Sequence, residues 1–372
     1  MTETDAATGQ PDYSGLVPGR LGWKVTVATL AHRFFSLIHD SYTAGLISQP
    51  QDANKAGAWP VAYFNLYLQK IGVNTGGATD LGQMFAAMEH AGLLMRAGWR
   101  ADMVGVPMHG QLYISQGVTS AQIQGSLWLS EVIGPELVIE SYKAVTVQIS
   151  GGEGRPSGTG LVLDRTHVLT NRHVVEGLVG PNLGAEITMN PSFKPPNGEW
   201  MTRPSVIRAH PKVDVAVIDT QMRDNEHLLA LPGMVFRDPK WADDIRVFGY
   251  PYAGTTEQHI SIERGDIVDQ EAEAPAVGGY PRHKIFLTSA IARPGNSGGP
   301  IVAQDGRVVG LVVDHARDVS SSDGTQEKSD DAPGKDSGSP PFYRGIPAGE
   351  VVRAIEELGY PDLAVVENDR SA

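Results

Sequence analysis

The sequence predicts a mainly β fold, an antiparallel barrel or sandwich, preceded by a smaller and mainly helical domain. At 372 residues the chain is long for a single domain, so two units are expected. From about residue 140 onward, short β-branched runs alternate with Gly, Pro, Asp and Asn, which is typical of many short antiparallel strands. The 43 Gly and 25 Pro residues also fit a fold with many turns better than a helical bundle.

The composition disfavours several classes of function. A formal net charge of −13 argues against a general binder of nucleic acid or of anionic membranes. The chain has no cysteine, which rules out disulfides, a thiol nucleophile and a cysteine-based zinc site. Residues 151–160, GGEGRPSGTG, lack the G-x-G-x-x-G spacing and are expected to form a loop. Because no motif such as H-E-x-x-H is present either, neither a metal nor a cofactor is expected.

The N-terminal segment does not resemble a targeting signal. Residues 1–20 lack a basic start followed by an apolar run, and we expect them to be disordered. Residues 25–38, VTVATLAHRFFSLI, are interrupted by His32 and Arg33 and predict an amphipathic core helix. No apolar run reaches the roughly 18 residues that a membrane span needs. A cytoplasmic protein is therefore the expectation.

Residues 21–139 are expected to form the helical domain. Apolar residues recur three and four positions apart in residues 61–72 and 80–99, which predicts two one-faced helices, the second capped by Asp80. A third helix is expected within residues 119–134. We assign the Met and aromatic side chains of this region to a hydrophobic core rather than to a cofactor site.

Residues 140–360 are expected to form the β domain. Residues 348–359, AGEVVRAIEELG, predict one closing helix, and residues 361–372 a polar tail. Residues 317–341 are acidic, Ser-rich and almost free of large apolar groups, which predicts a flexible loop. The strands are expected in the runs KAVTVQI, GLVLD, HVLT, AEITM, SVIRA, DVAVID, IRVFGY, QHISIE, KIFLTSA, PIVA and RVVGLVV.

The sharpest chemical signal is the run Gly295-Asn296-Ser297-Gly298-Gly299-Pro300, directly before a predicted strand. Attack by a serine on a peptide carbonyl creates an oxyanion, which needs backbone N–H donors beside the nucleophile. Glycines allow the tight path that turns the N–H groups of Gly295 and Ser297 inward, with Asn296 close by. The alternative is a plain glycine turn before a strand.

A serine nucleophile needs a base, and the base needs a carboxylate that orients it. His173 follows two predicted strands and is expected at a strand end that faces a cleft, whereas His167 is expected to face solvent. Asp214 opens the apolar run VAVI, where a buried acid is unfavourable unless an imidazole N–H pairs with it. Asp219, at the other end of this strand, is interpreted as an exposed terminator.

These motifs together resemble a known family. The similarity to bacterial HtrA-type and related trypsin-like serine peptidases lies in the segments TGLVLDRTHVLTNRHVV, HPKVDVAVID, VFGYP and SAIARPGNSGGPIVAQDGRVVGLVV. They follow the order His, Asp, Ser that this family uses. The segment FYRGIPAGEVVRAIEELG is similar to the one that closes the protease domain in the family. The likeness covers roughly residues 140–360.

The resemblance implies a two-barrel chymotrypsin-like fold with the triad Ser297, His173 and Asp214 between the barrels. It also implies a serine endopeptidase that acts on proteins or peptides through an acyl-enzyme. The PDZ domains of typical HtrA proteins are not found in the sequence, nor is an Ile-Val-Gly-Gly activation site. Residues 21–139 leave open a winged-helix-like module or a protein-docking domain, used for recruitment or control by a protein partner.

Substrate preference stays open between two alternatives. The resemblance implies a primary specificity pocket lined by Ile291 and by the strand that ends near Val313, Asp314 and His315. Ile291 favours a small aliphatic side chain of the substrate, whereas Asp314 favours a basic one.

Two other functions were weighed. A protease fold kept as a non-catalytic binding module is disfavoured, because all three triad residues are present. An α/β ester hydrolase is disfavoured because it requires Ser before Asp before His, and the order here is the reverse.

Overall fold

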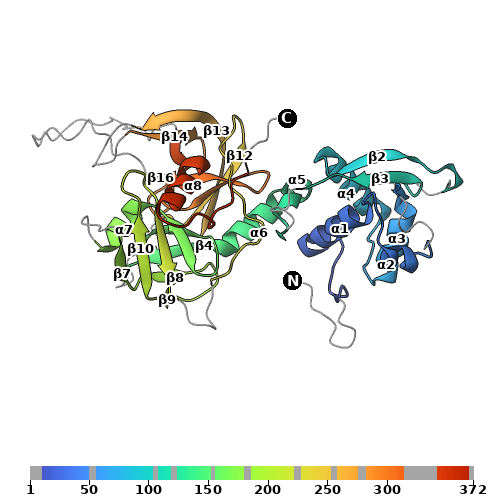
Figure 1. The fold of residues 1–372 in the computed structure, drawn as a ribbon, viewed down its shortest axis with the longest axis horizontal. Helices are drawn as coiled ribbons and strands as arrows, with labels where there is room; N and C mark the ends of the chain where they lie inside the picture. Colours follow the sequence, from blue (N-terminus) through green and yellow to red (C-terminus); the bar gives the residue numbers. More distant parts are fainter. Residues whose placement is uncertain are drawn as a thin grey trace, which may run out of the picture. The chain divides into compact units, whose positions relative to one another are not determined.

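The computed structural model describes residues 11–49, 56–103, 108–118, 124–151, 156–179, 186–221, 228–252, 258–274, 282–313 and 342–367. Two compact units make up the chain, Met1–Leu137 and Val138–Ala372. Helices dominate the first unit and strands the second (Figure 1).

The first unit combines helices with a small antiparallel sheet of strand order β1-β3-β2. A short strand precedes a pair of helices, and a hairpin follows them, which is the order of elements in a winged helix. The elements are α1 (Leu21–Phe34), α2 (Ser41–Leu46), β1 (Trp59–Pro60), α3 (Val61–Lys70), α4 (Ala78–His90), β2 (Leu94–Trp99), η1 (Ala101–Met103), β3 (Gln111–Ser115), η3 (Leu127–Leu129) and α5 (Ser130–Ile133).

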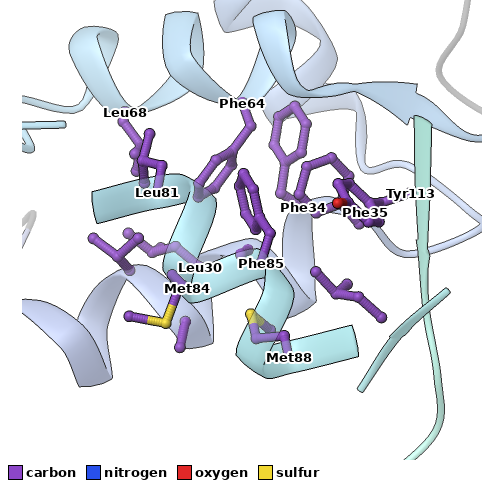
Figure 2. Close-up of a cluster of buried hydrophobic side chains, with 14 of the residues drawn as sticks. Leu30, Phe34, Phe35, Phe64, Leu68, Leu81, Met84, Phe85, Met88 and Tyr113 are labelled. Atoms are coloured by element: carbon purple, nitrogen blue, oxygen red, sulfur yellow. The ribbon is translucent and has the colours of Figure 1, made fainter. Parts of the chain in front are cut away.

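An aromatic cluster forms the core of this unit. Phe35 lies 5.5 Å from the ring of Phe64 and 5.7 Å from that of Phe85, and Tyr113 of β3 closes the cluster (Figure 2). Offset and edge-on pairs of this kind stabilise a core beyond the area that they bury. Met84 and Met88 lie beside these rings and are almost fully buried. The prediction that Met and aromatic side chains here form a core is confirmed.

The segment 80–99, expected to be one helix, is a helix followed by a strand. Helix α4 ends at His90, and Gly92 has a φ of +70°, the left-handed conformation that commonly terminates a helix. The chain then runs along β3 as strand β2. Asp80 does cap α4, but from within its first turn, by accepting the N–H of Gly77 at 2.8 Å.

Two further expectations for this unit differ from the structure. Residues 11–20, expected to be disordered, form turns, and Tyr13 and Leu16 pack against the core. Within residues 119–134, the described residues form no single helix but a 3-10 residue at Gln124 and the short η3 and α5. The expected start of that helix lies outside the described residues.

The second unit begins within α6 (Pro135–Val145) and continues into an antiparallel sheet of eight strands. The strand order is β7-β10-β11-β6-β5-β4-β8-β9. The elements are β4 (Thr146–Ser150), β5 (Pro156–Val162), β6 (His167–Thr170), α7 (Arg172–Val179), β7 (Ile187–Met189), β8 (Ser192–Lys194), β9 (Met201–Thr202), β10 (Ser205–Ala209) and β11 (Ala216–Thr220).

A closed barrel of six strands follows, in the order β12-β13-β14-β17-β16-β15. Its interior is filled by alternate apolar residues such as Ile245, Val247, Phe286 and Ile301, as expected for strands with one buried face. The elements are β12 (Asp244–Gly249), β13 (Ser261–Ala274), β14 (His283–Thr288), β15 (Pro300–Ala303), β16 (Val308–Val313), β17 (Tyr343–Pro347) and α8 (Ala348–Glu357). The predicted two-barrel architecture and the closing helix are confirmed.

Two segments of this unit depart from the sequence prediction, and the polar tail makes a contact that the prediction did not include. The run KAVTVQI was expected to be a strand, but Lys143–Val145 ends α6, whose Val138 and Tyr142 are buried on one face. In the glycine-rich run 151–160, expected to be a loop, residues 156–160 belong to β5. In the tail 361–372, expected only to be polar, the N–H of Glu367 donates to Phe236.

The predicted acidic loop 317–341 lies outside the described residues. Within the described ranges, no helix is both long and apolar enough to cross a membrane. The cytoplasmic location remains a prediction from the sequence.

Candidate active site

Ser297 lies in a tight loop between β14 and β15. The loop begins with a turn in which the N–H of Asn296 donates to the C=O of Arg293 at 2.9 Å, with Pro294 and Gly295 at its centre. Gly295 has a φ of +101°, and Pro followed by a residue of positive φ is the pattern of a type II turn. A side chain at Gly295 would also collide with neighbouring backbone, so this position requires glycine for two reasons.

Next to the serine hydroxyl, the N–H groups of Gly295 and Ser297 have no hydrogen-bond acceptor among the described residues. By contrast, the N–H groups of Gly298 and Gly299 donate to backbone carbonyls at 3.1 and 2.9 Å. Two such donors beside a serine hydroxyl can stabilise an oxyanion. Asn296, predicted to lie with them, uses its own N–H inside the turn.

His173 and Asp214 are hydrogen-bonded to each other. The Nδ1 of His173 lies 2.7 Å from Oδ2 of Asp214, and the backbone N–H of His173 donates to Oδ1 at 2.9 Å. A carboxylate at Nδ1 favours the tautomer that carries its proton there and leaves Nε2 as the basic nitrogen. Asp214 is buried, whereas 35% of the His173 side chain is exposed. His173 was expected at a strand end, but it lies in the first turn of α7.

The backbone around Asp214 is held on both sides. The side-chain N–H of Asn171, a wholly buried residue, donates to the C=O of Asp214 at 2.8 Å. On the other side, Nδ1 of His210 accepts the N–H of Val213 at 2.9 Å, and its Nε2 lies 2.9 Å from Glu357 of α8. Hydrogen bonds on both faces of this loop restrict the position of the carboxylate.

The Ser297 loop approaches α7 across a glycine of β5. A Cβ at Gly158 would lie 2.7 Å from a methyl carbon of Val174 and 3.1 Å from the carbonyl oxygen of Ser297. Val174 directly follows His173 in the chain. The backbone of Ser297 and the first turn of α7 therefore lie on either side of one glycine.

His167 and Asp219 differ from their predicted roles. The Nδ1 of His167 lies 2.9 Å from Asp164, its Nε2 lies 3.8 Å from Asp219, and its ring lies 5.1 Å from that of Tyr360. Only 18% of the side chain is exposed, so the prediction that His167 faces solvent is wrong. Asp219 is the second acidic neighbour of this histidine rather than an isolated strand terminator.

The residues expected to line the specificity pocket are only partly described. Ile291, in the stretch before the Ser297 loop, is 39% exposed. Val313 ends β16, next to Val312, whose N–H donates to the C=O of Gly299 at 2.9 Å. The other two, Asp314 and His315, lie outside the described residues. The choice between an aliphatic and a basic substrate side chain thus remains a prediction.

Sequence reasoning missed two wholly buried polar residues, Thr159 and Asn171. Thr159 lies within the glycine-rich strand β5 and Asn171 directly follows the apolar strand β6, and a buried polar side chain in such a position requires a hydrogen-bond partner. This requirement for a partner was the signal by which the sequence analysis could have found the two residues. Within the described ranges, no three His, Asp or Glu side chains are grouped to hold a metal ion.

Part of this chain is similar to known peptidases. Residues 158–311 match the family model of the trypsin-like peptidase domain. Among solved structures, the Rv3671c protease of M. tuberculosis in its inactive form is 23% identical, with a TM-score of 0.42, and the match covers 60% of this chain and 93% of that one. The active form of the same protease is also 23% identical, with a TM-score of 0.42, and the match covers 60% of this chain and 84% of that one.

The HtrA-type protease AlgW with a tripeptide is 19% identical, with a TM-score of 0.40, over 60% of this chain and 63% of that one. The family model covers the whole span from His173 to Ser297. Residues 158–311 therefore form a trypsin-like peptidase domain.

Proposed function

We propose that this chain is a serine endopeptidase that hydrolyses peptide bonds through an acyl-enzyme on Ser297. His173 is the general base and acid, and Asp214 holds its ring and stabilises the imidazolium. The single observation that carries the proposal is the His173–Asp214 hydrogen bond of 2.7 Å, from a buried acid to a partly exposed ring. A catalytic base requires this arrangement, because the acid at Nδ1 orients the ring and leaves Nε2 free to take the proton.

The reaction proceeds in two halves. Oγ of Ser297 attacks the scissile carbonyl carbon while Nε2 of His173 takes its proton, and the N–H groups of Gly295 and Ser297 donate to the resulting oxyanion. The protonated His173 then gives its proton to the leaving amine nitrogen, and the C–N bond breaks. Water attacks the acyl-enzyme with His173 again as base, which releases the new carboxylate and restores Ser297.

The alternative is a non-catalytic binding module, which has no use for a catalytic triad. Ser297, His173 and Asp214 are all present in the chain. The His173–Asp214 pair also has its hydrogen bond of 2.7 Å, with the histidine ring partly exposed. This combination favours catalysis over binding alone.

The test uses a fluorophosphonate probe and a peptide library. We expect the full-length protein to be labelled on Ser297 and to cleave peptides, and Ser297→Ala to lose both. Ser289→Ala is the matched control, since Ser289 also carries a hydroxyl before β15 but accepts only the N–H of Asp266. Hydrolysis by purified Ser297→Ala at the wild-type rate would rule out this nucleophile.

We further propose that the first unit recruits or controls the peptidase through a protein partner. It has its own aromatic core, and it contributes none of the residues proposed for catalysis. A chain that starts at Gly134 retains all of α6 and is expected to fold and to cleave short peptides as fast as the full chain. An unfolded product, with full-length protein stable, would instead make the first unit part of the protease core.

A further inference from the structure

Thr159 uses every hydrogen-bonding group that it has. Its backbone N–H donates to the C=O of Ser297 at 2.9 Å, and its own C=O accepts the hydroxyl of Thr170 at 2.7 Å. Its hydroxyl accepts the N–H of Tyr250 at 3.0 Å and donates to the C=O of Gly295 at 2.7 Å. The residue is wholly buried in β5. It therefore joins the first sheet to the residue that follows β12 and to the loop of Ser297.

The direction of the hydroxyl is fixed by its two partners. A backbone N–H can only donate and a carbonyl oxygen can only accept, so the hydroxyl proton must point at Gly295. Tyr250 is itself buried, which leaves water little access to replace either bond. The carbonyl of Gly295 is thus held at one orientation by a side chain from the opposite sheet.

That carbonyl follows the central peptide of a turn. In the turn from Arg293 to Asn296, the central peptide joins Pro294 to Gly295 and carries the Gly295 N–H. Type I and type II turns differ by a flip of this peptide, and the positive φ of Gly295 belongs to type II. The C=O of this peptide accepts the N–H of Tyr252 at 3.0 Å, and the hydroxyl of Thr159 holds the C=O that follows Gly295. Because the peptides on both sides of Gly295 are hydrogen-bonded, its φ is held at the positive value, and a flip would remove one of the two oxyanion donors.

We propose that Thr159 is a positioning residue that keeps the Gly295 N–H aimed at the developing oxyanion and the Ser297 backbone in place. This inference depends on the proposed peptidase function. The effect should appear in the transition state rather than in substrate binding, because the oxyanion exists only after attack.

The experiment compares Thr159→Val, which has the same shape without the hydroxyl, with Thr159→Ser, which keeps it. We expect Thr159→Val to lower kcat by about 10- to 100-fold with KM within about threefold of wild type, because displacing an oxyanion donor acts on kcat. Thr159→Ser should restore kcat to within about threefold. Inhibition by a peptide boronate, which mimics the tetrahedral adduct, should weaken in Thr159→Val by a factor similar to the loss in kcat.

Thr220→Val is the matched control. Thr220 is also a buried threonine of this sheet, and its hydroxyl donates to the C=O of Thr166 at 2.8 Å, away from the Ser297 loop. It should lose stability with kcat unchanged. If Thr159→Val does not fold, Thr159→Cys, with its weak donor, should give an intermediate kcat.

An unchanged kcat in folded Thr159→Val, or a change in its KM alone, would overturn the inference. The peptidase proposal would still stand in that case, because the wild-type protein would be active. A wild-type protein that neither reacts with fluorophosphonate nor cleaves peptides would instead overturn the peptidase proposal.

Discussion

The pairs His173–Asp214 and His167–Asp164 both lie in the second unit, and their burial is opposite. In the pair His173–Asp214 the acid side chain is 8% exposed and the ring 35%, with 2.7 Å between Nδ1 and Oδ2. In the pair His167–Asp164 the acid side chain is 45% exposed and the ring 18%, at 2.9 Å. The contact distance alone does not distinguish them.

The difference lies in how each pair is built. Asp164 stands three residues before His167 and also accepts the N–H groups of Thr166 and His167, which makes it the cap of a local turn. Asp214 stands 41 residues after His173 and reaches it only through the fold. A buried acid with an exposed ring directs the basic nitrogen outward, whereas an exposed acid with a covered ring stabilises a turn.

The largest expected difference between the two pairs is the effect on kcat of replacing each histidine by alanine. We expect His173→Ala to lower kcat by about 10⁴-fold or more, since members of a triad act as a unit. His167→Ala should keep kcat within about threefold and lose about 1 kcal/mol of unfolding free energy with its hydrogen bond. Steady-state kinetics and urea unfolding measure both. Equal losses of activity in the two variants would contradict the assignment.

The two acids should differ by a smaller but still large factor. Asp214→Asn keeps the shape but presents an N–H to Nδ1, which imposes the wrong tautomer on His173. A loss of about 10³- to 10⁴-fold in kcat is expected, as in other triads. Asp164→Asn should leave kcat unchanged. Circular dichroism of both variants checks that the folds are intact, and a wild-type rate in folded Asp214→Asn would remove Asp214 from the site.

The smallest expected effect is the pH dependence of stability at the local pair. Partial burial alone would raise the pKa of Asp164, but the hydrogen bonds from His167 and from two backbone N–H groups outweigh it and lower the pKa to about 2. Burial alone would lower the pKa of His167, but the hydrogen bond and charge of Asp164 and the charge of Asp219 raise it above 6.5.

The acid therefore contributes stability that is present above pH 3.8 and is lost as the pH falls toward 2. The histidine contributes stability that is present below pH 6.5 and is lost as the pH rises through its higher folded-state pKa. The difference in unfolding free energy between wild type and His167→Gln should thus be larger at pH 5.5 than at pH 8.5. Urea unfolding at the two pH values measures it, and an equal difference at both would contradict the pairing.

The sequence by itself determined many strands of the β domain, the closing helix and the candidate nucleophile, but not β8, β9 and β17. Short β-branched runs between turn residues are local signals, and the glycines around Ser297 answer a local requirement for a tight turn. The same reasoning was wrong where tertiary packing decided the conformation. Leu94–Trp99 carries a helical pattern, but it becomes a strand because Gly92 ends α4 and β3 offers a pairing edge.

Only the tertiary structure distinguished the two histidine–aspartate pairs. The periodicity of a sequence predicts which side chains of a strand or helix are buried. Hydrogen bonds between residues that are distant in the chain depend instead on how the strands pair. Asp214 pairs with His173 across 41 residues, and Thr159 reaches Gly295 across 136. Contacts at such separations arise from the register of the sheets, because that register fixes which backbone groups are satisfied and which donors remain available.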